Sequence, residues 1–193
     1  MRRCFARIIR RKTPYMNKVS VTVNAHIDGA AFKRFARFDT FTLRRRWVLP
    51  IAFALILSAF AAVAFFMRSR AEQAPLIGWL LLGIGLLLPA AYFLHYELQL
   101  NAQVRRLGIK KPRPAYFVTL TDEGVRVVNN MAKEAPLVLT WDHLHGAYRR
   151  ADAIYLYHTE NRAFILPAKD ASVSLPTLWD TCCTHLPKEK VHG

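Results

Sequence analysis

The chain has 193 residues, of which 53% are hydrophobic, and a formal net charge of +15. Such a charge would point to nucleic acid in a soluble protein, but the cations here show no interleaved aromatic platform and no recognised motif, so no nucleic-acid partner is expected. Because two long stretches are apolar, there is room for only one small soluble domain of about 80–100 residues. Cys4, Cys182 and Cys183 are an odd number, and structural disulfides are not expected.

Residues 1–16 form a strongly basic leader, MRRCFARIIRRKTPYM. One interpretation is a leader that is unstructured, or that is wrongly included because translation begins at Met16. The other is a basic amphipathic segment on a membrane surface, with Phe5, Ile8 and Ile9 inserted among the headgroups. Neither interpretation adds to the fold, which is expected to begin at residue 17.

Residues 17–46 are predicted to form a strand and a short helix. Valines alternate with polar residues from position 19 to 23, the pattern of a half-buried strand. Asp28 can then cap a helix with an apolar phenylalanine stripe. Because a lone strand is not stable in water, this strand needs a sheet, and the only candidate sheet lies after residue 114.

Residues 47–67 and about 74–96 are predicted to be two transmembrane helices, a hairpin over residues 47–96. At about 1.5 Å rise per residue each reaches roughly 30 Å, the thickness of a hydrocarbon core. The alternative, a pair of buried core helices in a soluble protein, fits less well because such helices are usually shorter and amphipathic. Neither span contains an acidic residue, which argues against an ion path.

Arginines set the expected orientation of the hairpin. They cluster before the first span and after the second, whereas the link between the spans has two. Because cationic loops stay in the cytoplasm during insertion, both termini are expected inside. Each such cation near anionic headgroups is attracted by about 1 kcal/mol. The candidate membrane-surface contacts are Arg44, Arg45, Arg46, Arg105 and Arg106.

Small residues recur every four positions in the first span, at Ala54, Ser58 and Ala62. They make a candidate seam on which another helix could pack closely. The other interpretation is that alanine and glycine are simply common in membrane helices. Pro89 is expected to bend the second span by removing an internal hydrogen bond.

Residues 97–114 are predicted to be a helical extension, ended by Gly108, and a stiff linker. Residues 115–187 then read as a small α+β domain, an antiparallel sheet curled over one terminal helix that Ser172 or Ser174 caps. Gly124 closes a predicted turn at a position needing positive φ. The predicted strands cover residues 116–121, 125–128, 137–141, 144–148, 154–158 and 163–166.

Four short motifs carry a family resemblance: YFVTLTDEGVRVV from Tyr116, LTWDHL around Trp141, IYLY from Ile154 and ILPAK from Ile165. They resemble the YcxB-like C-terminal domain family of small bacterial membrane proteins. The resemblance implies two inner-membrane helices, cytoplasmic termini and a pleckstrin-homology-like sheet with a C-terminal helix. It implies no biochemical activity. Ala168 is a departure, because the family more often has a basic residue directly after the proline.

Catalytic chemistry is not expected. His143 and His145 alternate on a predicted strand and could share a metal, but no third ligand stands at a recognisable spacing. Cys182 falls on the apolar stripe of the terminal helix and is expected in the core, as is Trp141. An undetected enzyme would need the two histidines or Cys183. The sequence therefore predicts no cofactor, no metal and no enzymatic activity.

Two functional interpretations follow. The first is a membrane-anchored cytosolic interaction module that binds a protein, a peptide or a lipid headgroup. The second is an oligomeric, structural or channel-like membrane protein packed through the small residues of the first span. The expected partners are the lipid bilayer, a cytosolic or membrane protein, and a second copy of the chain.

Overall fold

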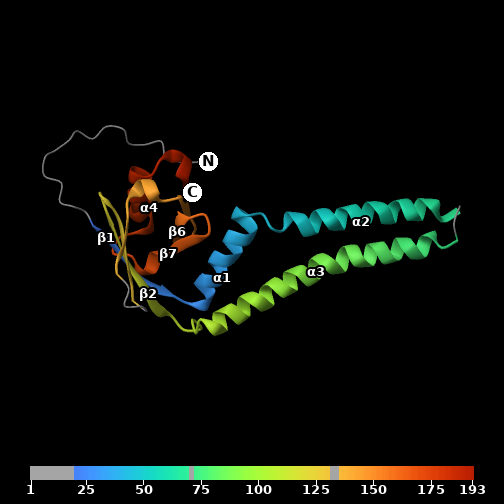
Figure 1. The fold of residues 1–193 in the computed structure, drawn as a ribbon, viewed down its shortest axis with the longest axis horizontal. Coiled ribbons are helices and arrows are strands. Elements are labelled where there is room, and N and C mark those ends of the chain that lie inside the picture. Colours follow the sequence, from blue (N-terminus) through green and yellow to red (C-terminus); the bar gives the residue numbers. More distant parts are fainter. Residues whose placement is uncertain (1–19, 70–71, 131–134) are drawn as a thin grey trace. The chain divides into compact units, whose positions relative to one another are not determined.

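The computed structural model describes residues 20–69, 72–130 and 135–193, and the chain forms two compact units (Figure 1). The helical unit is Gly29–Lys110, and the sheet unit combines the chain up to Asp28 with the chain from Lys111 onward. The predicted basic leader, with Cys4, lies outside the described residues, as does Val19. The sheet unit is therefore discontinuous in sequence, with the helices inserted into it.

The first sheet joins the N-terminal strand to the segment that follows the long helices. Strand β1 (Val21–Ile27) pairs antiparallel with β2 (Arg113–Thr121), and Val23 lies opposite Val118. The predicted sheet partner of the N-terminal strand is thus confirmed, although the strand runs on to Ile27. The spatial order is β1-β2-β3-β4, with β3 at Gly124–Asn129 and β4 at Leu137–Leu139.

The second sheet has the spatial order β7-β6-β5-β8. Strands β5, β6 and β7 are antiparallel neighbours, and β8 pairs parallel with β5. The sequence predicts the first three of these strands but not β8, which is too short to have a pattern of its own. The bounds are Gly146–Arg149 for β5, Ala153–Thr159 for β6, Arg162–Pro167 for β7 and Val191–His192 for β8.

A 3-10 turn, η3 (Trp141–His143), ends the extended segment predicted over residues 137–141. Trp141 is buried, and its indole N–H donates to the carbonyl oxygen of Thr121 at 2.9 Å. Because this inward turn bends the backbone, His143 is not on a strand. The prediction that His143 and His145 alternate on one strand face is wrong.

The core of the sheet unit lies between the strands and one terminal helix, α4 (Leu175–His185). The side chain of Ser174 caps α4 by accepting from the backbone N–H of Thr177 at 3.4 Å. Ser172, the other predicted cap, instead accepts from the N–H of Thr22 on β1 at 3.1 Å. Fully buried core members include Val23, Leu120, Ile154, Leu166 and Leu178, so β1 contributes to the same core as the C-terminal helix.

The hydroxyl of Tyr116 links the two sheets. It donates to the carbonyl oxygen of Ile165 on β7 at 3.0 Å and accepts from the backbone N–H of the same residue. Burial raises the pKa of Tyr116 well above its ordinary value, so the phenol stays protonated and keeps both bonds.

Gly124 begins β3 with φ of +157°, and a Cβ there would lie 2.2 Å from the carbonyl oxygen of Leu139 on β4. No side chain fits in that gap, so Gly124→Ala should force β3 and β4 apart and destabilise the sheet unit by about 2–4 kcal/mol. The shift of the urea unfolding midpoint measures this loss. Arg126→Ala, an exposed change on the same strand, should stay within about 0.5 kcal/mol; equal midpoints would contradict the predicted clash.

The described part of the helical unit consists of three short and two long helical segments. Both long helices, α2 and α3, are long and apolar enough to span a membrane. The second predicted span and its extension form one helix, which ends before Gly108 at φ of +64°, as the sequence predicts. The bounds are Gly29–Arg37 for α1, Phe38–Leu43 for the π-helical turn η1, Val48–Phe66 for α2, Met67–Ser69 for the 3-10 turn η2, and Ala74–Arg106 for α3.

Candidate functional site

The surface of the long helices is apolar and exposed. Leu49 is 79% exposed, Leu87 71% and Phe66 89%. Only 11% of the most apolar window of each helix is buried, whereas a core helix of a soluble protein is mostly buried. Soluble proteins rarely expose a continuous apolar surface of this extent, but a bilayer would cover it.

Glycines allow the two long helices to approach each other. A Cβ on Gly78 would lie 2.9 Å from the ring of Phe65, and a Cβ on Gly85 would lie 3.3 Å from the Cβ of Leu57. Both glycines are buried in α3. The two helices run side by side as a hairpin (Figure 1), and small residues make this close packing possible.

The three small residues of the predicted seam lie in different surroundings. Ala54 and Ser58 are half-buried, and the carbonyl oxygen of Ala54 lies 3.5 Å from the Cβ position of Gly85. The hydroxyl of Ser58 donates to that same oxygen at 2.8 Å. Ala62 is exposed, and its neighbour Ala61 is fully buried. Ala54 thus faces α3 within the hairpin, and Ala62 lies on the open surface of α2.

Polar and aromatic contacts fix α1 and η1 to the C-terminal half of α3. The guanidinium of Arg37 donates to both carboxylate oxygens of Glu97, at 2.9 and 2.8 Å. The ring of Phe41 packs edge-on against that of Tyr96 at 4.7 Å, and the Tyr96 hydroxyl donates to Thr40 at 3.3 Å. These contacts join residues far apart in the sequence, and no local pattern signalled them.

The predicted membrane-surface arginines differ in how they are held. Arg44 forms an ion pair with Asp39 at 2.9 Å. Arg45 and Arg46 are exposed, and no ion pair to their side chains is found among residues 20–69, 72–130 and 135–193. Arg105 and Arg106 are exposed in the last turn of α3, where a cation is favoured by the helix dipole.

A cavity of about 550 Å³ opens between the start of α2 and the middle of α3. Its walls are almost wholly apolar, and its two polar lining residues contribute mainly apolar atoms. No sequence pattern predicts this cavity, because a space between two helices depends on how they pack. The lining residues are Arg46, Leu49, Pro50, Phe53, Leu88 and Tyr92.

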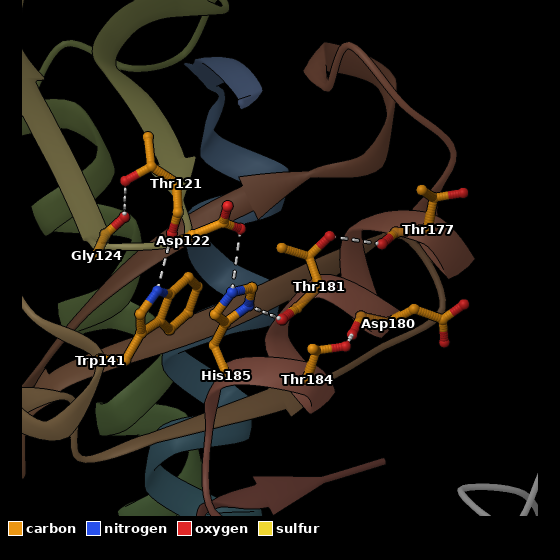
Figure 2. A network of polar contacts seen from close by, with 9 residues as sticks. All are labelled: Thr121, Asp122, Gly124, Trp141, Thr177, Asp180, Thr181, Thr184 and His185. Carbon is orange, nitrogen blue, oxygen red and sulfur yellow. Dashed lines mark hydrogen bonds and ion pairs between the residues drawn. The ribbon is translucent and has the colours of Figure 1, made fainter. Parts of the chain in front are cut away.

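In the sheet unit, His185 at the end of α4 stacks on Trp141 of η3 and forms an ion pair with Asp122 in the β2–β3 turn (Figure 2). The rings of Trp141 and His185 lie 4.8 Å apart at 16°. Nδ1 of His185 is 2.9 Å from the carbonyl oxygen of Thr181, and Nε2 is 3.4 Å from the carboxylate of Asp122. The Thr181 hydroxyl donates to the carbonyl of Thr177 rather than to the ring, so Thr181 is not placed as a nucleophile for this Asp–His pair.

The other residues considered for catalysis are not brought together. Nδ1 of His143 lies 2.6 Å from the hydroxyl of Thr140, and His145 is exposed before β5. Cys182 is fully buried in the core, as predicted, and Cys183 is half-buried. Within the described part of the chain, no group of three histidine, cysteine or acidic residues is placed to hold a metal ion.

Burial raises the pKa of the Cys182 thiol from 9.0 to about 12. We expect Cys182 to resist alkylation at pH 8 in the folded protein, because the reactive thiolate is suppressed and enclosed. Cys183, its half-buried neighbour, should react faster, as peptide mass spectrometry can measure. The raised pKa stabilises the fold fully below pH 9, and this contribution is lost as the pH rises toward 12. Equal labelling of the two cysteines would contradict the packing of α4.

Comparisons with protein-family models, with curated proteins and with solved structures find no match for this chain.

Proposed function

We propose that this is an integral membrane protein whose two helices anchor a small interaction domain beside the membrane. The observation that carries the proposal is the insertion of two exposed apolar helices between β1 and β2, which are neighbours in one sheet. A chain that crosses a bilayer twice returns to its starting side, so both parts of the sheet unit can meet there. The arginines at the base of the hairpin favour the cytoplasmic side.

We further propose that the sheet unit is a pleckstrin-homology-like domain of the YcxB-like family. Its support is a four-stranded antiparallel sheet, a second sheet and a C-terminal helix packed on the shared core. The four motifs that resemble the family fall on β2 and β3, on the end of β4 with η3, on β6, and on β7 with η4. The bacterial inner membrane is the location that this resemblance implies.

The last strand of the first sheet supports a role in binding proteins. Strand β4 lies at the end of the sheet order, and Leu137 and Val138 on it are 42% and 69% exposed. An apolar edge strand is a template on which an extended peptide can add a further strand. We therefore favour a peptide or protein partner for the domain over a catalytic role.

Two measurements on the whole protein in cells test this proposal. The chain should stay with the membrane fraction after an alkaline wash, and a reporter at the C-terminus should be active in the cytoplasm. A photoreactive amino acid at Val138 should capture a defined partner, whereas the same group at exposed Glu160 should not. A chain that leaves the membrane fraction would reject the membrane anchor, and a reporter active outside the cytoplasm would reject the orientation. Equal capture from Val138 and Glu160 would reject β4 as the binding edge.

The exposure of Ala62 supports a second candidate, an oligomer or channel-like assembly packed through α2. In that case Ala62→Phe should dissociate the oligomer in mild detergent, while Val63→Phe, at an exposed apolar neighbour, should not. Light scattering of the purified protein decides the matter, and a monomeric wild-type protein would exclude this candidate.

A further inference from the structure

We propose that the cavity at the base of the hairpin binds one anionic phospholipid, with its phosphate on Arg46 and an acyl chain against Leu49, Phe53 and Leu88. This inference rests on the proposed membrane location, because only helices in a bilayer meet phospholipid. It goes beyond that location by assigning a defined site and a preferred headgroup charge.

The composition of the cavity matches an amphiphile. Its volume of about 550 Å³ lies in the usual range of small-molecule sites, about 300–1,000 Å³. Both helices contribute wall residues, so the space is a groove shaped by the hairpin rather than the side of a single helix. Apolar side chains line its length, and Arg46 stands just before α2 begins at Val48. A lipid with a hydrocarbon chain and an anionic headgroup matches this arrangement, with an apolar length and a cation at one end.

The charges around the opening favour phosphate on Arg46. The guanidinium of Arg44 is engaged by the carboxylate of Asp39, at 2.9 Å. The described residues place no carboxylate on Arg46. A guanidinium can form two parallel hydrogen bonds to phosphate oxygens. In a zwitterionic lipid the phosphate stands beside the cation of its own headgroup, which repels the guanidinium, so an anionic lipid is favoured.

The packing of the hairpin explains why a space exists at this level. Toward η2 the helices meet through Gly78 and Gly85, whose missing side chains let them touch. On the other side of Gly85, the facing residues are the larger Phe53, Leu88 and Tyr92. Pro89 lies in the same stretch of α3 and lacks the N–H that would bond to the carbonyl of Gly85. The larger side chains and the hydrogen bond missing at Pro89 therefore leave a cavity next to the close helix contact at Gly85.

Native mass spectrometry of the full-length protein tests the proposal. The protein is released from nanodiscs made of equal amounts of phosphatidylglycerol and phosphatidylcholine, and the lipids that stay bound are counted. We expect one retained phosphatidylglycerol, preferred over phosphatidylcholine by about tenfold, the size of one charge-assisted contact. Arg46→Gln should remove this preference. Arg68→Gln, which removes the same charge at the opposite end of α2, should leave it unchanged.

A second pair of variants tests the apolar part of the site. Leu88→Trp should fill the groove and lower retention of both lipids. Leu87→Trp is the matched control, since Leu87 is 71% exposed and does not line the cavity. Circular dichroism should give the same helix content for all four variants, so that a loss of lipid is not a loss of fold.

The outcomes separate this inference from the proposed function. A chain that leaves the membrane on alkaline washing rejects both. A membrane-bound chain that retains the two lipids equally has only a surrounding lipid layer, and this rejects the site alone. Equal losses for Arg46→Gln and Arg68→Gln would show general attraction to anionic headgroups and would also overturn the proposal.

Discussion

Replacing Gly29–Lys110 by a short glycine-containing turn should convert the protein into a soluble domain that folds cooperatively. Ile27 and Arg113 are paired across β1 and β2, so the two cut ends lie close enough for a hairpin turn. The exposed apolar surface of α2 and α3 is removed, and the core of the sheet unit is kept whole. The measurement is the fraction of protein in the supernatant, followed by a single urea transition.

The matched comparison is the segment from Lys111 to the C-terminus alone, without β1. It should remain largely unfolded, because β1 buries Val21, Val23, Ala25 and Ile27 in the sheet unit. Burial of a valine or isoleucine side chain contributes about 1.5–3 kcal/mol, and a domain has only about 5–15 kcal/mol of stability. If this shorter segment folds as well as the joined one, β1 is not an integral strand.

Val23→Asp should unfold the sheet unit in the full-length protein. Val23 is fully buried opposite Val118, and a carboxylate there would lie in the apolar core. Losing the valine and burying an acidic group together cost more than about 4 kcal/mol, which exceeds the margin of many small domains. Limited proteolysis of the detergent-solubilised protein should then cut throughout the residues after Lys111.

Asn24→Asp provides the control for this substitution. Asn24 is the next residue of the same strand but lies exposed on the opposite face. The added charge is identical, and the expected loss of stability is below about 0.5 kcal/mol. Equal protease sensitivity of the two variants would mean that charge, rather than burial at Val23, weakens the strand.

Local patterns account for the parts of the fold that the sequence predicts. A run of apolar residues long enough to cross a bilayer is visible without any tertiary information, and so is the alternation around Val21 and Val23. The requirement that a strand must have partners then placed β1 in the sheet after the helices. Gly108 and Gly124 marked a helix end and a turn because positive φ favours glycine.

The missed features all depend on contacts between distant residues. The Arg37–Glu97 pair joins residues that share no motif, and the cavity exists only between packed helices. The position of His143 was mispredicted because the neighbouring Trp141 turns inward to donate to Thr121. The local sequence around His143 is compatible with both a strand and a turn. The packing of the Trp141 indole determines which of the two forms.

The pairing of β1 with β2 also sets the order of events during synthesis. A ribosome adding about 5–20 residues each second needs roughly 4–16 s to make the stretch between the two strands. During this delay β1 has left the ribosome, but its partner does not yet exist. The sheet can close only after the inserted helices have been translated, so the sheet unit cannot be completed before α2 and α3 have been made.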